Sequence, residues 1–243
     1  MAESQHIERE FKEWWSPSLG RDMELIRYGY SGTPILAFPG NEGRYYDWEN
    51  HGLTDALDVQ LKKGYNQLIT IDSVDKESLL NKNVEPEIRI GRYKQYLSYV
   101  VEEVIPNIYD QTQYRFLIVT GFNMGALHAM NLALHHPRKV NKLLAMSGVY
   151  SLQSLWEETT DSQTRKYSPL DFVAHPANNE YLSKMGGMDI RLVASRFEPE
   201  FDQTEKLSYW FNSRMVAHQF DTWEDEAMKD WQLWGEMLKL HIP

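Results

Sequence analysis

The feature that most constrains the fold is an alternation of short apolar runs with longer helical patterns. Each run is rich in Ile, Leu and Val, and runs that are apolar throughout are typical of parallel strands covered on both faces. The predicted strands are Met23–Tyr28, Ile35–Phe38, Leu68–Ile71, Phe116–Thr120, Leu143–Met146 and Ile190–Ala194. The predicted helices are about His51–Lys62, Ile88–Tyr109, Met124–His136, Thr204–Asn212 and Lys229–Leu240.

This order predicts an α/β fold in which a mostly parallel central sheet carries helices on both faces. Only turn residues, Tyr30–Thr33, separate the first two predicted strands, so we expect these two to form an antiparallel hairpin at the N-terminal edge. The chain fits one domain, residues 1–243, because each half would have only a small core. Residues 151–188 are less regular, and we expect a lid-like excursion over the carboxyl ends of the strands.

Composition excludes several classes of function. The formal net charge of −10 argues against general nucleic-acid binding and against attraction to anionic membranes. The absence of cysteine excludes disulfides, Cys-zinc sites and a cysteine nucleophile. The N-terminus is charged, and no run approaches ~18 apolar residues, so we expect neither a signal peptide nor a membrane span. A soluble cytoplasmic protein is the expectation.

The most informative segment is FLIVTGFNMGALHAMNLALHHP, which begins at Phe116. A predicted buried strand leads into GFNMG, residues 121–125, and then into a predicted helix. Gly-x-Ser-x-Gly in this strand–turn–helix context forms a nucleophile elbow, whose glycines let the helix pack closely on the sheet. Here the central residue is Asn123, and a carboxamide cannot carry an acyl group. The sequence therefore predicts an elbow without its nucleophile.

Two roles are open for Asn123. Asn is among the non-glycine residues that best tolerate positive φ, so the residue can preserve a strained turn after the chemistry has gone. Alternatively, its amide binds a polar group of a ligand. The sequence favours the structural role.

Together with the elbow, the rest of the chain resembles the esterase-D-like putative esterases of the α/β-hydrolase superfamily. The further segments that carry the resemblance are WWSPSLGRDMELIRYGYSGTPILAFPGNEGRYYDWENHGL, TIDSVDKESLLNK, HHPRKVNKLLAMSGVYSL and MKDWQLWGEMLKLHI. The resemblance covers nearly the whole chain and implies an α/β-hydrolase fold.

The resemblance also implies a catalytic serine, acid and histidine. The serine position falls on Asn123. The acid position falls near Glu198, with Glu200 or Asp202 as alternatives. The histidine position falls on Lys229, because the family's His-Asp-Trp reads Lys-Asp-Trp here. Nucleophile and base are both replaced, which predicts a degenerate catalytic triad.

Lys229 is not an obvious base, because a lysine with a pKa of ~10.4 stays protonated unless burial lowers that pKa strongly. An ion pair between Lys229 and Glu198 is the simpler expectation.

The backbone N–H donors expected to form the oxyanion hole are better preserved than the triad. In the family the loop read here as FPGNEGRYY supplies one backbone N–H, from Gly40 or Asn41, and Met124 supplies the other. These donors predict a pocket for a small-molecule ligand with a carbonyl, a carboxylate or another anionic group.

Other chemistry has little support in the sequence. No His/Asp/Glu cluster has the spacing of metal ligands and no nucleotide-binding glycine motif occurs, so we expect neither a metal nor a cofactor. His128 follows the elbow on a helix, where we expect packing or a surface position. Ser147 stands at a strand end, where we expect packing or a turn.

Three functions are compatible with these observations. The first is a non-catalytic α/β-hydrolase-fold protein, a pseudoenzyme that binds a small ligand or a protein partner. The second is an active ester or acyl hydrolase with a displaced catalytic set, Lys229 and Glu198 together with the oxyanion loop. The third is a scaffold that forms a homo-oligomer. Whether the chain is an enzyme stays open from the sequence alone.

Overall fold

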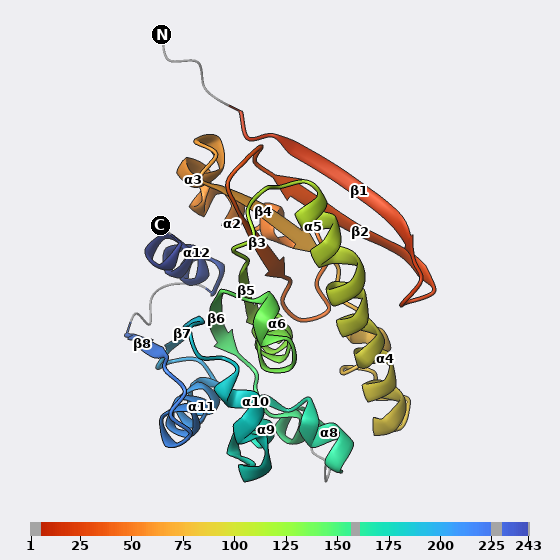
Figure 1. Cartoon of the computed structure of the whole chain (residues 1–243), viewed down its shortest axis with the longest axis vertical. Helices are drawn as coiled ribbons and strands as arrows, with labels where there is room; N and C mark the ends of the chain where they lie inside the picture. Colours follow the sequence, from red (N-terminus) through yellow and green to blue (C-terminus); the bar gives the residue numbers. More distant parts are fainter. Residues whose placement is uncertain (1–5, 157–160, 225–229, 243) are drawn as a thin grey trace.

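The computed structural model of the chain describes residues 6–156, 161–224 and 230–242. Its centre is an eight-stranded sheet with the strand order β1-β2-β4-β3-β5-β6-β7-β8 (Figure 1). Neighbours from β4 to β8 are parallel, whereas β1 with β2 and β2 with β4 are antiparallel. The strands are β1 (Arg9–Ser16), β2 (Arg21–Tyr28), β3 (Thr33–Phe38), β4 (Asn66–Ile71), β5 (Ile118–Asn123), β6 (Lys142–Gly148), β7 (Asp189–Ser195) and β8 (Gln219–Trp223). The predicted α/β fold with a mostly parallel sheet is confirmed.

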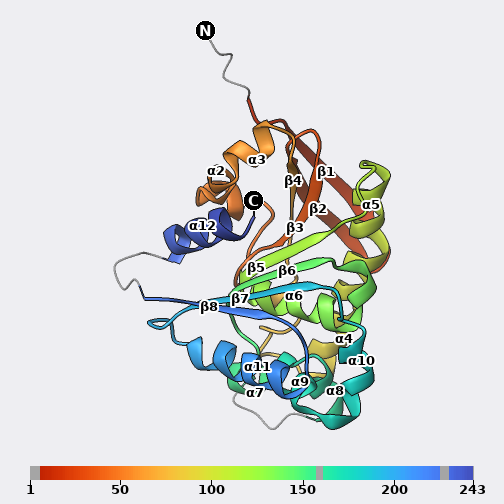
Figure 2. The ribbon, with the colours of Figure 1, turned by 60° about the vertical axis from the view of Figure 1, so that its left-hand side comes forward.

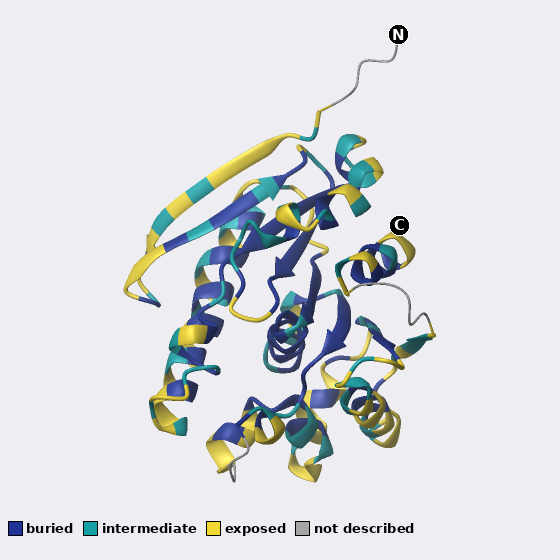
Figure 3. Ribbon diagram, turned by 180° about the vertical axis from the view of Figure 1, so that it is seen from behind, coloured by how far each residue is buried: buried dark blue, intermediate teal, exposed yellow. Residues whose placement is uncertain are grey.

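The N-terminal edge hairpin is present, but one of its strands differs from the prediction. β1 pairs with β2, and β2 pairs on its other side with β4. β3, which contains the predicted strand 35–38, is separated from β2 by β4 and runs parallel to β4 and β5. The prediction paired residues 23–28 with 35–38 because it overlooked β1. That strand mixes charged and aromatic residues, as REFKEWWS, and lies largely exposed at the sheet edge (Figure 3).

Helices cover both faces of the sheet, as predicted (Figure 2). One face carries α1 (Asp47–Asn50), α2 (Leu53–Ala56), α3 (Asp58–Lys62) and α12 (Asp230–His241). The opposite face carries α4 (Pro86–Tyr99), α5 (Ile105–Asp110), α6 (Met124–His135) and α11 (Phe201–Ser213), and a π-helical turn, Val100–Val104, joins α4 to α5. Hydrophobic core fills the space between the sheet and the helices on each face.

Residues 151–188 contain short helices rather than long irregular loops. They are α7 (Leu152–Trp156), α8 (Ser162–Lys166), α9 (Pro169–Ala174) and α10 (Asn179–Ser183). A 3-10 turn, Pro176–Asn178, lies between α9 and α10, and two others, Asp75–Glu77 and Pro137–Lys139, lie elsewhere in the chain. Of these helices, α8 packs against α4, α9 packs against α6 and α11, and α10 packs against α6. No helix in the part of the chain that the structure describes is long and apolar enough to span a bilayer.

Candidate functional site

The turn between β5 and α6 has a strained backbone. Asn123 adopts φ 54° and ψ −119°, and side-chain-bearing residues rarely have a positive φ. Asn123 ends β5 and directly precedes Met124, the first residue of α6. Its side chain makes no helix-capping hydrogen bond, so capping does not account for this conformation. The sharp strand-to-helix turn is the geometry that a nucleophile elbow requires.

Two glycines permit this turn through close approach of backbone segments. A Cβ on Gly121 would lie 2.4 Å from the carbonyl carbon of Gly125. A Cβ on Gly125 would lie 2.4 Å from the carbonyl oxygen of Pro39. Both neighbours are backbone atoms, which cannot move aside as a flexible side chain can. The glycines of GFNMG therefore keep the start of α6 in contact with the end of β3.

The predicted oxyanion loop lies against the elbow. A Cβ on Gly40 would meet the ring of Phe122 at 2.5 Å. Further along the loop, Glu42 has φ 52°, and its N–H donates to Oδ2 of Asp75 at 3.2 Å. The carboxylate of Asp75 is fully buried, and its Oδ1 lies 2.9 Å from Nε2 of His128 on α6. A buried hydrogen-bonded pair thus ties the loop to the helix that follows the elbow.

A cavity of about 540 Å³ opens beside Asn123. Its wall comes from the elbow, the ends of β6 and β7, the loop after β7, and the first turns of α12. The lining residues are Asn123, Ser147, Ser195, Phe197, Glu198, Pro199, Glu200, Asp230, Leu233 and Trp234. The volume lies within the usual range of small-molecule sites.

Ser147 reaches this cavity because the ladder between β5 and β6 is irregular at its end. Asn123 pairs with Gly148, so Ser147 is an extra residue, and its φ is 48°. Such bulges redirect a side chain and often lie next to functional sites. The Oγ atom of Ser147 accepts a hydrogen bond from Nε1 of Trp234 at 2.9 Å. Ser147 is buried, as a packing residue would be, and it also lines the cavity.

Glu198 carries a perturbed carboxyl group in the cavity wall. Burial raises the pKa of Glu198 to about 7, and a hydrogen bond with Ser147 opposes the rise, while the carboxylates of Glu200 and Asp230 add to it. The Oε1 atom of Glu198 is buried and has no hydrogen-bond partner within the described ranges. A carboxyl group that titrates near neutral pH in a cavity is a common property of functional sites. Glu198 can therefore exchange a proton under physiological conditions.

This pKa predicts a pH-dependent difference in stability between the parent protein and Glu198→Gln. The folded pKa of about 7 exceeds the ordinary value of 4.5, so folding favours the protonated carboxyl group. Its stabilising contribution is fully present below about pH 4.5 and is lost as the pH rises through about 7. Gln mimics the protonated form, so the variant should gain about 1–3 kcal/mol relative to the parent between about pH 4 and pH 8.

Urea unfolding of both proteins at the two pH values measures this difference. Glu87→Gln, at an exposed position on α4, is the matched control and should show no such pH-dependent gain. An equal stability difference for Glu198→Gln at the two pH values would contradict the assignment.

The structure brings two of the predicted site residues, Asn123 and Glu198, to one cavity. Of the alternative acids, Glu200 also lines the cavity, whereas Asp202 lies in the first turn of α11 and does not line it. Lys229 lies outside the described residues. That Glu198 occupies the acid position of the triad stays a prediction, and the structure places this residue in the same cavity as Asn123.

The predicted anion donors flank the elbow without lining the cavity. Met124 and Gly40 are buried beside Asn123, and Asn41 is exposed on the loop. Sequence reasoning missed most of the cavity wall. Ser147, expected from the sequence to serve packing or a turn, and Ser195 lie at the ends of neighbouring parallel strands. That shared position is the signal that could have placed both in the site, because such strand ends meet at one edge of the sheet.

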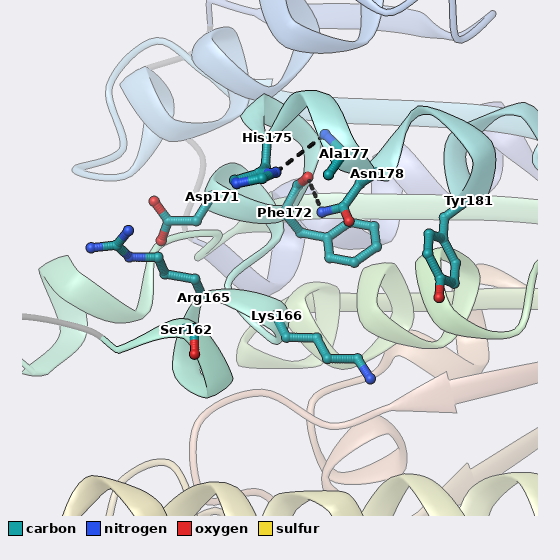
Figure 4. Close-up of a pocket in the computed structure, with 9 residues that line it drawn as sticks. All are labelled: Ser162, Arg165, Lys166, Asp171, Phe172, His175, Ala177, Asn178 and Tyr181. Atoms are coloured by element: carbon teal, nitrogen blue, oxygen red, sulfur yellow. Dashed lines mark hydrogen bonds between the residues drawn. The ribbon is translucent and has the colours of Figure 1, made fainter.

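A second cavity of about 380 Å³ lies in the excursion (Figure 4). Arg165 and Lys166 from α8 and Asp171 from α9 contribute to its wall, and Nδ1 of His175 accepts a hydrogen bond from the N–H of Ala177 at 3.2 Å. No predicted site residue lines it. Across the described ranges, no group of three or more His, Asp or Glu is arranged to hold a metal ion. The cavity beside the elbow is therefore the candidate site.

Several solved structures share this fold. An S-formylglutathione hydrolase, FrmB, from Staphylococcus aureus is 13% identical, with a TM-score of 0.70 and coverage of 97% of each chain. A ferulic acid esterase is 14% identical, with a TM-score of 0.76 and coverage of 98% of this chain and 97% of that chain. MPT51 from Mycobacterium tuberculosis is 15% identical, with a TM-score of 0.67 and coverage of 95% and 96%. No curated protein is significantly similar to the chain in sequence.

At these identities the solved structures establish the α/β-hydrolase fold and nothing finer. The family relationship comes from the sequence itself, along the stretch that builds β4 to β8, the elbow and the cavity. The sequence model of the putative esterase family matches residues 46–241, from the residue before α1 to the last residue of α12, and the chain therefore belongs to the putative esterase family.

Proposed function

We propose that this member of the family has lost serine-hydrolase activity and binds a small ligand in the cavity beside Asn123. The observation that carries the proposal is the strained elbow itself, with φ 54° at residue 123 and a carboxamide in place of a nucleophile. A carboxamide can form hydrogen bonds but cannot form an acyl-enzyme intermediate. The elbow, the adjacent loop and the cavity are the parts of an esterase site that can bind a ligand without a catalytic nucleophile.

The elbow supports binding of a carbonyl or carboxylate group. Met124 begins a helix of 12 residues, so its N–H belongs to the unpaired amides at the positive end of the helix dipole. The Nδ2 group of Asn123, which lines the cavity, is a hydrogen-bond donor that suits such a group. The side-chain amide of Asn123 offers the polar contact in the cavity wall, and the helix dipole behind it favours an electron-rich group there.

The second candidate function is hydrolysis by a displaced catalytic set. The observation that favours it is Glu198, because a carboxylate with a pKa of about 7 suits a general base near neutral pH. In this alternative Glu198 activates water, and Lys229, which the sequence places near the site, assists. Turnover of a short acyl ester that is abolished in Glu198→Gln would establish it.

A fluorophosphonate probe separates the two candidates from an intact serine hydrolase. We expect no covalent labelling of the parent protein and no hydrolysis of p-nitrophenyl acetate above buffer, because residue 123 has no hydroxyl group. Intact-protein mass spectrometry measures the labelling. Labelling at any serine would refute the proposal.

The double reversion Asn123→Ser with Lys229→His tests whether the remainder of the site is assembled. We expect this variant to hydrolyse p-nitrophenyl acetate at least about tenfold faster than Asn123→Ser with Lys239→His, the control with its histidine at an exposed position on α12. Equal rates in the two folded variants would show that the acid or the oxyanion donors are out of place.

A further inference from the structure

We infer that two copies of the chain form a symmetric dimer in which their β1 strands pair antiparallel and join the two sheets into one. The inference is independent of the function proposed for the cavity. The feature that points to it is a regular, open edge strand whose charges match those of a second copy in one register.

The outer side of β1 is unpaired in the part of the chain that the structure describes. β1 ends the sheet, and it pairs with β2 from Arg9 to Ser16 without a bulge (Figure 1). The N–H of Gly29 donates to the carbonyl oxygen of Glu8 at 2.8 Å, so the even-numbered residues of this segment bond toward β2. Backbone groups alternate in direction along an antiparallel strand. The N–H and C=O groups that point to the open edge therefore belong to Arg9, Phe11, Glu13 and Trp15.

The symmetry of a dimer restricts how two such strands can pair. A two-fold axis perpendicular to the sheet places the residue at the centre of the pairing opposite its own copy. A register centred on any charged residue of β1 would therefore bring two like charges face to face, which is destabilising. The charged residues are Arg9, Glu10, Lys12 and Glu13. Registers centred on Trp14 or later would pair only residues 12–16 or fewer, so the register centred on Phe11 is favoured.

The register centred on Phe11 matches charges of opposite sign. It places Glu10 opposite Lys12 of the second copy and Arg9 opposite Glu13 of the second copy, and the symmetry repeats both pairs. Opposite charges directly across two strands stabilise their pairing. The backbone groups of Phe11 point to the open edge, so the two chains can exchange hydrogen bonds at the centre of the interface.

Glu13 has the most to gain from this arrangement. Its side chain is exposed and forms no ion pair with any described residue, and the β2 residue directly opposite it is another acid, Glu24. The other three charged residues of β1 already form ion pairs with described residues. Arg9 of the second copy would give the Glu13 carboxylate a cation.

Exposed apolar side chains lie on the same strand. Phe11 is 46% exposed and Trp15 is 61% exposed. In this register Phe11 meets its own copy and Trp15 meets Ile7 of the second copy, on one face of the joined sheet. Aromatic cross-strand pairs and the burial of apolar surface favour association. The edge therefore combines backbone groups, charges and apolar surface that a second copy complements.

The mass in solution tests the inference directly. We expect sedimentation equilibrium at about 200 µM to give twice the mass of one chain. Amide exchange at Phe11 and Glu13 should be slower at about 200 µM than at about 2 µM, whereas exchange at Lys12, whose N–H bonds toward β2, should not change. A monomer at the higher concentration, or a dimer without this protection, would overturn the inference.

Two substitutions at one position separate the backbone pairing from the loss of a side chain. Phe11→Pro and Phe11→Ala both remove the ring, but only proline lacks the N–H that would bond to the second copy. Because this N–H points away from β2, proline should leave the fold intact, which circular dichroism checks. We expect the dissociation constant of the dimer to be at least about tenfold higher for Phe11→Pro than for Phe11→Ala. Equal dissociation constants in the two folded variants would rule out the pairing.

A charge reversal provides a second test that does not depend on proline. Glu13→Arg would face Arg9 of the second copy at both ends of the pairing, whereas within its own chain the substituted side chain would stand opposite Glu24. We expect this variant to raise the dissociation constant of the dimer at least about tenfold. Glu205→Arg, at an exposed position on α11, is the matched control and should leave the dimer unchanged. A dimer that Glu13→Arg does not weaken would use another surface, and the inference would fail.

Discussion

Replacement of Asp75 by alanine is expected to lower the free energy of unfolding by about 3–5 kcal/mol. Asp75 and His128 have side chains with no solvent exposure, and Oδ1 of Asp75 lies 2.9 Å from Nε2 of His128. The other carboxylate oxygen accepts the N–H of Glu42 at 3.2 Å. Truncation leaves the buried imidazole without its partner and removes the acceptor of the Glu42 N–H. Such unpaired buried groups cost more than the pair itself contributes.

Urea or thermal unfolding measures this loss, and Tyr99→Phe provides the control. Tyr99 is fully buried in the same core, and its hydroxyl has no hydrogen-bond partner in the described part of the chain, so its removal should change stability by less than about 1 kcal/mol. Amide hydrogen exchange at Glu42 should also accelerate in Asp75→Ala. A loss below about 1 kcal/mol in Asp75→Ala would show that the pair contributes little.

Gly125→Ala should destabilise the protein by about 2–4 kcal/mol. The new Cβ atom would lie 2.4 Å from the carbonyl oxygen of Pro39 and 2.6 Å from that of Phe38. Real Cβ atoms do not approach backbone oxygens so closely, so α6 would have to move away from the end of β3. The elbow begins α6, and its backbone would therefore be disturbed by the same substitution.

Gly91→Ala is the matched control for Gly125→Ala. Gly91 lies inside α4, and a Cβ there would meet nothing within 4 Å. Because alanine favours the helix over glycine, this variant should be more stable than the parent by about 0.5–1 kcal/mol. Opposite signs for the two Gly→Ala substitutions in chemical denaturation would confirm the packing argument, and similar effects would contradict it.

The inner strands of the sheet were predictable because each contains a short run rich in Ile, Leu or Val, and all six predicted strands overlap β2 to β7. The two edge strands were harder to recognise. β1 mixes charged and aromatic residues, and β8 is only partly buried, so neither carries the apolar run of an inner strand. Missing β1 led directly to the wrong partner for β2 in the hairpin.

The elbow was predictable because strand, turn and helix are contiguous in the sequence. The rest of the site depends on tertiary contacts between distant segments. Asp75 and His128 are 53 positions apart, and Ser147 and Trp234 are 87 apart, so no local pattern connects them. The sequence also left three acids open in one loop, and only the fold distinguishes the two that line the cavity, Glu198 and Glu200, from Asp202.

The position of Trp234 has an optical consequence. Its indole N–H donates to Ser147, its ring stacks on Phe122 with centroids 4.1 Å apart, and the residue lines the cavity with Glu198. Indole emission responds to nearby charge and polarity, so a change in protonation at Glu198 or the arrival of a ligand alters the surroundings of this chromophore. The cavity thus contains its own fluorophore, and its occupancy can be followed without a label.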